Sequence, residues 1–231
     1  MKIKYLILLA FICTGLATPV SANMLVSNSI IHFGGDQPGR EDVEIENPTD
    51  EPMYIKVTPS IVHNPGTEDE SRDVITNPKK AGLLVSPNKL VIPPGGRKLI
   101  RFVNLRPQAA QEHVYRVAIT PVVNDVKANA TGVKILIGYE VLVLTQPVNA
   151  QPVLVAERNG STLNFRNDGN TNVLLREGYQ CPFKTEDKEQ CEPLNGKRIY
   201  PGNNWSVSLP LDRPVEYYLA VGRKNSVAVY Q

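Results

Sequence analysis

Short segments that alternate apolar and polar residues recur from residue 24 to the end of the chain, and this pattern constrains the fold more than any other feature. Alternation is typical of β-strands with one buried face, because successive side chains of a strand point to opposite sides. Clusters of Pro, Gly, Asn and Asp, which favour turns, separate the segments. No segment carries a convincing amphipathic helical pattern. The sequence therefore predicts an all-β chain.

The candidate strands fall into two groups. The first has about seven strands, as in an immunoglobulin-like sandwich, and includes one polar, acidic stretch, His63–Asp73, that is expected to be a loop. The second restarts after Pro152 and predicts a smaller β domain. The first group comprises Met24–Phe33, Asp42–Glu46, Met53–Val57, two strands within Leu83–Phe102, Glu112–Ile119 and Thr131–Pro147, and the second comprises Val153–Glu157, Thr162–Arg166, Val173–Glu177, Trp205–Leu209, Glu216–Val221 and Val227–Tyr230.

The segment Thr131–Pro147 predicts a long strand with two different halves. In its first half Val133, Ile135 and Ile137 recur at every second position, and its second half contains the continuous apolar run Val141–Leu144. Val, Ile and Tyr suit a pleated surface. The proline-rich QPVNAQP that follows breaks the pattern and predicts a hinge between two domains.

The first residues have the pattern of a secretory signal peptide. Lys2 and Lys4 precede the apolar run Tyr5–Leu16, and small residues lead up to Ala22. The apolar run is shorter than the ~20 residues that span a bilayer, which argues against a membrane anchor. The chain is therefore expected to be exported and cleaved after Ala22. The expected parts are a signal peptide over residues 1–22, an N-terminal domain over 23–147 and a C-terminal domain over 148–231.

The charge balance and the motifs exclude several classes of function. Loss of Lys2 and Lys4 reduces the 25 basic residues to 23, which equals the number of acidic residues. A neutral mature chain has no overall field for nucleic acid or an anionic membrane, so any basic function must be local. Catalytic and phosphate-binding motifs are absent from the sequence, and His32, His63 and His113 fall in unrelated segments. We expect no enzyme, cofactor, metal or nucleotide.

The cysteines predict one disulfide. Cys13 leaves with the signal peptide, so an exported chain retains Cys181 and Cys191 as an even pair. A metal site or a redox pair is the alternative, but the sequence has neither a CxxC motif nor a histidine near these cysteines. Closing so short a loop would restrict the unfolded chain by roughly 3 kcal/mol.

Several motifs occur in a specific order through nearly all of the mature chain. They are Asn47-Pro48-Thr49, Leu84-Val85-Ser86-Pro87, Ile92-Pro93-Pro94-Gly95, Lys98-Leu99-Ile100-Arg101, Val114-Tyr115-Arg116-Val117 and the alternating strand before the interdomain prolines. This order resembles the periplasmic chaperones of the chaperone–usher pathway of pilus assembly. His63-Asn64-Pro65-Gly66 and Ile199-Tyr200-Pro201-Gly202 are most similar to the alternate, colonisation-factor-type branch. The resemblance implies two immunoglobulin-like domains in a boomerang arrangement, and a location in the periplasm.

The resemblance also implies a binding mode. A pilin subunit of this system is an incomplete sandwich, and the long strand of the chaperone fills its groove with alternate apolar side chains. Carried over by position, these donors are Val133, Ile135 and Ile137. Residues at this spacing lie ~6.6 Å apart along one face of a strand, which suits successive pockets. The alternative is that the three face the domain's own core, although residues such as Tyr139 and Val141 could already supply that inward face.

The family uses a basic pair to hold the terminal carboxylate of the subunit, and this sequence departs from that pattern. Alignment by the flanking residues puts Ile30 and Leu142, both apolar, at the two positions. Arg116, Lys134 and Arg101 are the basic residues on neighbouring strands that could replace the pair, with Arg116 the first candidate. An arginine would bind a carboxylate through two parallel hydrogen bonds. Each of the three is otherwise an ordinary surface residue.

The implied partners are pilin or fimbrial subunits and an outer-membrane usher that receives them. An unshielded apolar strand would also allow a self-capping homodimer in the free form. A different class of function is a secreted two-domain adhesion or receptor-type protein that binds through its loops, for which Asn129, Asn159 and Asn204 would be glycosylation acceptors. A pilin or adhesin is disfavoured, because the residues after Ala22 enter a strand almost at once.

Overall fold

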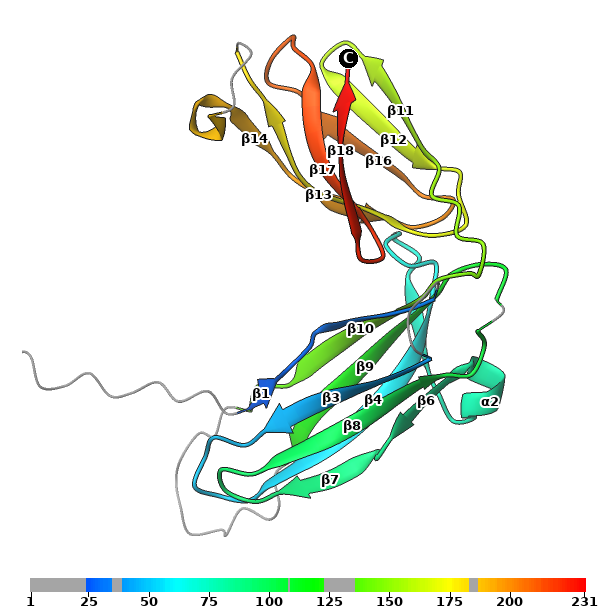
Figure 1. Cartoon of the computed structure of the whole chain (residues 1–231), viewed down its shortest axis with the longest axis vertical. Coiled ribbons are helices and arrows are strands. Elements are labelled where there is room, and N and C mark those ends of the chain that lie inside the picture. Colours follow the sequence, from blue (N-terminus) through cyan, green and yellow to red (C-terminus); the bar gives the residue numbers. More distant parts are fainter. Residues whose placement is uncertain (1–23, 35–38, 108, 123–135, 183–186) are drawn as a thin grey trace, which may run out of the picture.

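The computed structural model of the chain describes residues 24–34, 39–107, 109–122, 136–182 and 187–231. The predicted signal peptide, residues 1–22, lies outside this part. Figure 1 shows two β domains that meet at an angle, so that the molecule has the shape of a boomerang with a concave side, which we call the inside of the bend. No helix in the described part is both long and apolar enough to cross a membrane.

The N-terminal domain is a sandwich of two sheets. One has the strand order β1-β3-β8-β6 and the other β2-β10-β9-β4-β5, with β7 paired to β4. The chain changes sheets early, because β1 pairs antiparallel with β3 whereas β2 pairs parallel with β10. The elements are β1 Leu25–Val26, β2 Ile30–Phe33, β3 Arg40–Glu46, β4 Met53–His63, β5 Ser71–Val74, the one-turn helix α2 Pro78–Ala81, β6 Leu83–Ser86, β7 Lys89–Ile92, β8 Arg97–Asn104, β9 His113–Val122 and β10 Tyr139–Thr145.

The alternating pattern explains the core of this domain. In β3, Val43 and Ile45 are fully buried while the acidic residues that alternate with them, Asp42, Glu44 and Glu46, remain partly exposed, as the sequence predicted. Val43 and Ile45 share one hydrophobic cluster with Ile31, Val117 and Val143 of the facing sheet. Because burial of one such side chain contributes roughly 1.5–3 kcal/mol, the two sheets are held together mainly by their inner faces.

The C-terminal domain is a second, smaller sandwich. Its sheets have the orders β11-β12-β16 and β14-β13-β17-β18, with β15 paired to β13. Its core is aromatic: the ring of Phe165 lies 5.7 Å from that of Trp205, 5.6 Å from Tyr217 and 5.1 Å from Tyr230, measured between ring centroids. The elements are β11 Leu154–Asn159, β12 Thr162–Asn167, β13 Val173–Gln180, a 3₁₀ turn Lys188–Gln190, β14 Glu192–Leu194, β15 Lys197–Ile199, β16 Asn204–Ser208, β17 Val215–Val221 and β18 Lys224–Tyr230.

Each domain uses a buried asparagine to close one end of its sandwich. Asn47, directly after β3, donates from Nδ2 to the carbonyl oxygens of Glu51 and Ile92. Asn167, at the end of β12, donates in the same way to Thr171 and Ile199. Both side chains are fully buried, so these hydrogen bonds satisfy groups that burial would otherwise leave unpaired. The Asn-Pro-Thr motif of the sequence therefore has a structural role.

The segment expected to be a loop, His63–Asp73, is partly a hairpin. β4 runs through to His63, and β5 pairs with its end, with Ser71 opposite His63. All four residues of β5 are exposed, so this strand has no buried face and leaves no alternating pattern in the sequence. Its pairing depends on backbone hydrogen bonds, which the residue pattern does not reveal.

The long strand expected over Thr131–Pro147 is shorter in the described part. β10 begins at Tyr139, and residues 136–138 are not in a strand. Beyond Ile119, β9 continues to pair with β4 as far as Val122, but its pairing with β10 ends at the pair of Ile119 with Tyr139. Residues 136–138 therefore have no ladder partner within the described part of the chain, and residues 131–135 lie outside it.

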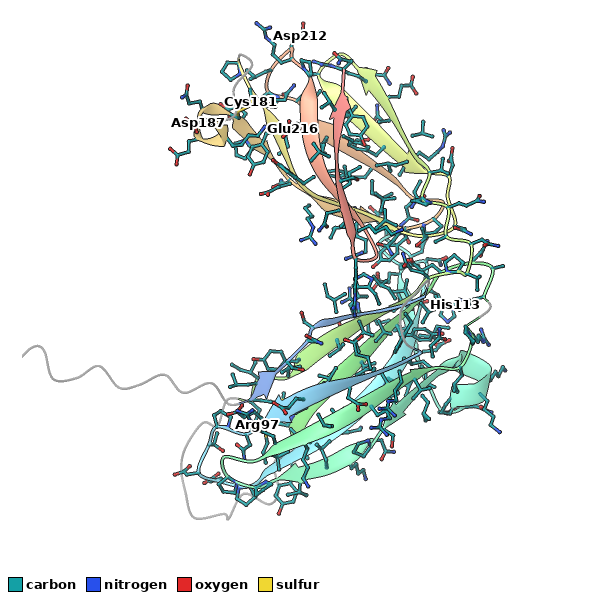
Figure 2. The ribbon with its side chains drawn as sticks, viewed as in Figure 1. Arg97, His113, Cys181, Asp187, Asp212 and Glu216 are labelled. Atoms are coloured by element: carbon teal, nitrogen blue, oxygen red, sulfur yellow. A yellow bond between two sulfur atoms is a disulfide. The ribbon has the colours of Figure 1, made fainter. Side chains whose placement is uncertain are left out.

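The predicted disulfide is confirmed. Cys181 and Cys191 are bonded, with their Cα atoms 4.3 Å apart. The bond ties the chain after β13 to the residue before β14. Figure 2 shows Cys181 at the end of the C-terminal domain away from the other domain. The disulfide therefore has a structural role, remote from the region between the domains.

Candidate functional site

One edge of the N-terminal domain is left partly open. β10 pairs with β9 along its whole length, but on its other side β2 pairs only with Leu142–Thr145. Within the described residues, the first three residues of β10 therefore have a ladder partner on one side only. Backbone N–H and C=O groups exposed at such an edge can accept another strand.

Exposed apolar side chains lie along this open edge. Ile137, two residues before β10, is 55% exposed, and Ile30, in β2, is 44% exposed. Ile30 pairs with Leu142, so it lies directly beside the point at which β10 loses its second neighbour. The edge therefore combines unpaired backbone with apolar surface, and both features favour strand addition.

The structure describes one of the three predicted donors. Val133 and Ile135 lie outside the described residues. Ile137 is exposed, whereas Tyr139 packs against the core of the domain and Val141 is fully buried within it. The inward positions of β10 are thus filled by other residues, and the side chain of Ile137 remains accessible to a partner.

The outward face of the same sheet is apolar where it meets the C-terminal domain. Leu142, Leu144, Val114 and Val62 form a buried cluster with Tyr200 of the C-terminal domain. The strand register arranges the residues of this face in rows across the sheet. We call this surface the hinge face, and it consists of Ile30, Leu142 and Arg116 in one row and His32, Leu144, Val114 and Val62 in the next.

Arg116 is the predicted anchor residue that reaches the hinge face. It lies opposite Leu142 on β9, while Ile30 lies opposite Leu142 on β2. The two positions aligned with the family's basic pair are therefore neighbours, and a basic residue stands one strand away. Arg116 Nε is 3.8 Å from Glu140 Oε2, which is longer than a hydrogen bond, and its side chain is 30% exposed. Its guanidinium thus retains donors for another acceptor.

The other two predicted anchors are placed differently. Arg101 lies on the sheet that contains β3 and β8, where its Nε and Nη2 donate to the Asp42 carboxylate at 2.8 and 2.9 Å. This hydrogen bonding holds the pKa of Asp42 below its usual value. Lys134 lies outside the described residues. The structure therefore brings Arg116, but not Arg101, to the hinge face.

The C-terminal domain supplies a second arginine. Arg198 in β15 and Tyr200, two residues later, reach the region between the domains. Burial lowers the pKa of Arg198, and the nearby charge of Arg116 acts in the same direction. Burial also raises the pKa of the Tyr200 phenol, and the charges of the two arginines oppose that rise. Two guanidinium groups and a phenol, drawn from both domains, therefore share one partly desolvated environment.

This arrangement can bind an anionic group. Guanidinium groups beside a desolvated apolar cluster form stronger bonds to a carboxylate than they would in water. The described residues contain no cluster of three or more His, Cys, Asp or Glu side chains suited to a metal ion. The chemistry of the site is therefore recognition by an open strand edge, an apolar face and a local positive charge.

Comparison with known proteins finds similarity to fimbrial proteins. No family model matches the chain. The chain is 30% identical over 175 residues to a CFA/I fimbrial protein of Escherichia coli, covering 72% of this chain and 73% of that protein. It is 29% identical over 178 residues to a CS1 fimbrial protein of the same species, covering 73% and 74%. The names of both relatives describe them as fimbrial subunits of the CFA/I and CS1 types.

Solved structures share this fold. The class 5 fimbriae chaperone CfaA superimposes with a TM-score of 0.65 at 24% identity, covering 90% of this chain and 98% of its own. The chain belongs to the periplasmic pilus-assembly chaperones of the chaperone–usher pathway. The SafB chaperone of Salmonella enterica, solved with the SafA pilin, has a TM-score of 0.63 at 15% identity and covers 93% and 98%. The chaperone therefore has the predicted fold of two immunoglobulin-like sandwiches.

A half-buried histidine lies on the hinge face of the chaperone. His32 lies opposite Leu144, and its Nδ1 is buried with no hydrogen-bond partner among the described residues. Burial, together with the charges of Arg198 and Arg223, lowers the pKa of His32 to about 4. The imidazole is therefore neutral near pH 7, and the positive charge beside the hinge comes from arginine.

A carboxylate fastens the two domains of the chaperone. Glu112 Oε2, just before β9, accepts hydrogen bonds from Thr171 Oγ1 at 2.7 Å and from Asn172 N and Nδ2 at 3.1 and 2.6 Å. Arg198 Nη1 donates to Asn172 Oδ1. Figure 2 shows His113, the neighbour of Glu112, beside the chain that links the domains. These bonds fix Arg198 relative to the N-terminal sheet.

Sequence reasoning missed Arg198, His32 and Glu112. The motif containing Tyr200 supported the family resemblance, but its position suggested no contact with the other domain. Arg198 and Tyr200 do stand two residues apart on either side of the buried Ile199, which is the spacing of one strand face. That spacing was the sequence signal that could have placed the two side chains on one face. The surface that this face contacts, the hinge face, is evident only in the folded structure.

Proposed function

We propose that donor-strand complementation is the means by which this chaperone holds a fimbrial subunit. The observation that carries the proposal is the open edge of β10, with Ile137 and Ile30 exposed beside it. A subunit that lacks one strand would pair with this edge and receive the side chains of Val133, Ile135 and Ile137 in its groove. Each side chain, if fully buried, contributes roughly 1.5–3 kcal/mol before the cost of ordering the segment is subtracted.

Arg116 and Arg198 together hold the terminal carboxylate of the subunit in this proposal. They stand on opposite sides of the hinge. Ile30 and Leu142 occupy the positions of the family's basic pair, so the positive charge of Arg116 lies one strand away from the usual place. The placement of Arg116 and its long distance to Glu140 support its role. The anchor fixes the register in which the donor side chains meet the groove, because a one-residue slip of a strand reverses its faces.

The cellular role follows from the same geometry. By covering the subunit's exposed apolar groove, the chaperone prevents premature aggregation and delivers the subunit to an outer-membrane usher, where the strand of another subunit replaces the donor segment. No chemical step is required, because better packing in the final product drives the exchange. The signal peptide over residues 1–22 accounts for export to the periplasm, and the domains over 23–147 and 148–231 form the mature chaperone.

A pair of matched substitutions tests the donor role. The chaperone is co-expressed with its cognate fimbrial subunit, and complexes are recovered from periplasmic extract. Ile137→Asp places a charge in an apolar groove, so recovery of the one-to-one complex should fall by about tenfold or more. Val74→Asp is the control, because Val74 is 59% exposed on β5, at the opposite edge of the same sheet.

Undiminished recovery of the Ile137→Asp complex would contradict the proposed donor role. Thermal unfolding of the free variants separates binding from folding, since both substitutions are at exposed positions and should leave the transition nearly unchanged. Equal losses for Ile137→Asp and Val74→Asp would also count against a specific role for this edge.

A further inference from the structure

We propose that the outward face of β17 and β18 is a second contact surface for the same bound subunit, formed by Tyr218, Val227 and Val229. The inference rests on the proposed function and adds a surface on the C-terminal domain to it. Val227 is 53% and Val229 is 57% exposed. Within the described residues β18 pairs only with β17, so it is an edge strand with apolar side chains on its outward face. Such an edge invites association unless a partner covers it.

The strand register defines which residues share this face. Tyr217 and Val215 point into the core of the domain, so the alternate positions Tyr218 and Glu216 point outward. Val227 pairs with Tyr218 and Val229 with Glu216, which places both valines on the outward side. The ring of Tyr179 on β13 lies 6.2 Å from that of Tyr218 and extends the same surface.

This surface is continuous with the region between the domains. Arg198 pairs with Leu174, and Leu174 pairs with Ala220, so these three side chains share the outward face of the sheet. Ala220 is only 4% exposed although it points outward, which shows that this end of the face is covered. Along β17, Tyr218 is the next outward residue after Ala220. The proposed surface therefore begins where the hinge contacts end.

The hairpin of β17 and β18 also reaches the N-terminal domain, at the end of β10 that β2 covers and next to the start of β3. A Cβ at Gly222, in the turn of this hairpin, would lie 2.7 Å from Gln146 Oε1, so the turn packs against the carboxamide of Gln146. Arg223 Nη2 is 3.5 Å from Glu41 Oε2. Figure 1 shows the turn of this hairpin above β10 and the sheet of β17 and β18 on the inside of the bend.

The dimensions of a bound sandwich indicate that it fills this space. A five-residue donor segment is about 17 Å long and only one strand wide, whereas a sandwich has two sheets about 10 Å apart. Stable interfaces bury about 800 Å² on each partner, more than the edge of one short strand supplies. A subunit that pairs with β10 on the inside of the bend therefore extends toward the facing sheet, where Tyr218, Val227 and Val229 offer apolar contact.

The test measures dissociation of the purified complex of the chaperone with its cognate fimbrial subunit. Val227→Asp/Val229→Asp should release a fluorescently labelled subunit roughly tenfold faster than the wild type. Val155→Asp is the matched control, because Val155 is 39% exposed on β11, in the other sheet of the same domain, and should not change the rate. Val227→Thr/Val229→Thr, which keeps the side-chain shape, is used if the aspartates disturb folding. It should also speed release of the subunit, by a smaller factor.

Each outcome decides between the alternatives. Unchanged dissociation of the double variants, together with loss of complex for Ile137→Asp, overturns this inference and leaves the proposed function intact. Retention of the complex by Ile137→Asp overturns the proposed function itself. A double variant that alters the oligomeric state of the free chaperone in light scattering, without altering subunit release, identifies the surface as a contact between two copies and also overturns the inference.

Discussion

The two outward faces of the N-terminal sandwich are built in opposite ways. The face of β3 and β8 is covered by cross-strand ion pairs, with Arg101 bound to Asp42 and Arg97 at 2.9 Å from Glu46. The hinge face carries a buried apolar cluster, and the nearest carboxylate oxygen to its arginine is 3.8 Å away. The first face satisfies its own charges and suits contact with water. The second leaves apolar surface and positive charge for another molecule.

The difference between the two faces indicates which arginine is available to bind a carboxylate of a partner. Arg101 and Arg116 both lie on outward sides of central strands, and the sequence makes both of them candidate anchors, with Arg116 the first. A carboxylate from a subunit would have to displace Asp42 from Arg101, but it could approach Arg116 without breaking a hydrogen-bonded pair. The availability of donors, and not the charge itself, separates a binding residue from a surface residue.

The largest expected difference between the two faces is in stability. Leu144 is fully buried on the hinge face and Leu99 is 52% exposed on β8. Leu144→Ala should lower the free energy of unfolding by about 2–5 kcal/mol, because it opens a cavity beneath Tyr200. Leu99→Ala should change it by less than about 0.5 kcal/mol. Urea denaturation of both variants measures the difference, and similar losses would show that the faces are not distinct.

The next effect concerns binding. Arg116→Ala should cause an about 10- to 100-fold weakening of the complex with a fimbrial subunit, since a hydrogen bond to a charged group contributes about 1.5–3 kcal/mol. Arg101→Ala should leave the affinity unchanged. Titration of purified chaperone variants with subunit released from a denatured complex provides the measurement. Equal affinities for both variants would remove Arg116 from the anchor and return the search to Arg198 and Lys134.

The smallest effect is a pH dependence from His32. Its folded pKa of about 4 lies below the usual 6.5, so the native state binds fewer protons than the unfolded chain between these values. The stability contributed by neutral His32 is therefore complete above pH 6.5 and is lost as the pH falls toward 4. Screening by solvent limits it to roughly 1–2 kcal/mol. The free energies of unfolding of the wild type and of His32→Gln should converge as the pH falls from 7 to 4. A constant difference between them would contradict the partial burial of the His32 imidazole.

Much of the fold could be predicted because its strands alternate strictly. β3 shows this directly, with Val43 and Ile45 in the core, and the even pair of cysteines gave the disulfide. β5 could not be predicted, because none of its residues is buried and no pattern marks it. β14 and β15 were also missed, since strands of three residues are too short to show a period.

The candidate site could be predicted only in part. Family position pointed to Ile30 and Leu142, and the structure shows them as neighbours in the sheet. The contribution of Arg198 depends on the hinge, which brings Arg198 of the C-terminal domain near Arg116 of the N-terminal domain. No local pattern encodes such a meeting of two domains. The open part of the β10 edge likewise follows from where β2 stops pairing.

Hydrogen–deuterium exchange of the free chaperone and its subunit complex tests the central claim most directly. The claim is that the subunit pairs with the open edge of β10 and not with the ion-paired face of β3 and β8. We expect the amides of residues 136–141 to exchange far more slowly in the complex, because they gain strand partners. The exchange rates of the amides of β3 and β8 should stay unchanged. Protection confined to β3 and β8, with residues 136–141 exchanging as fast as in the free chaperone, would contradict the account.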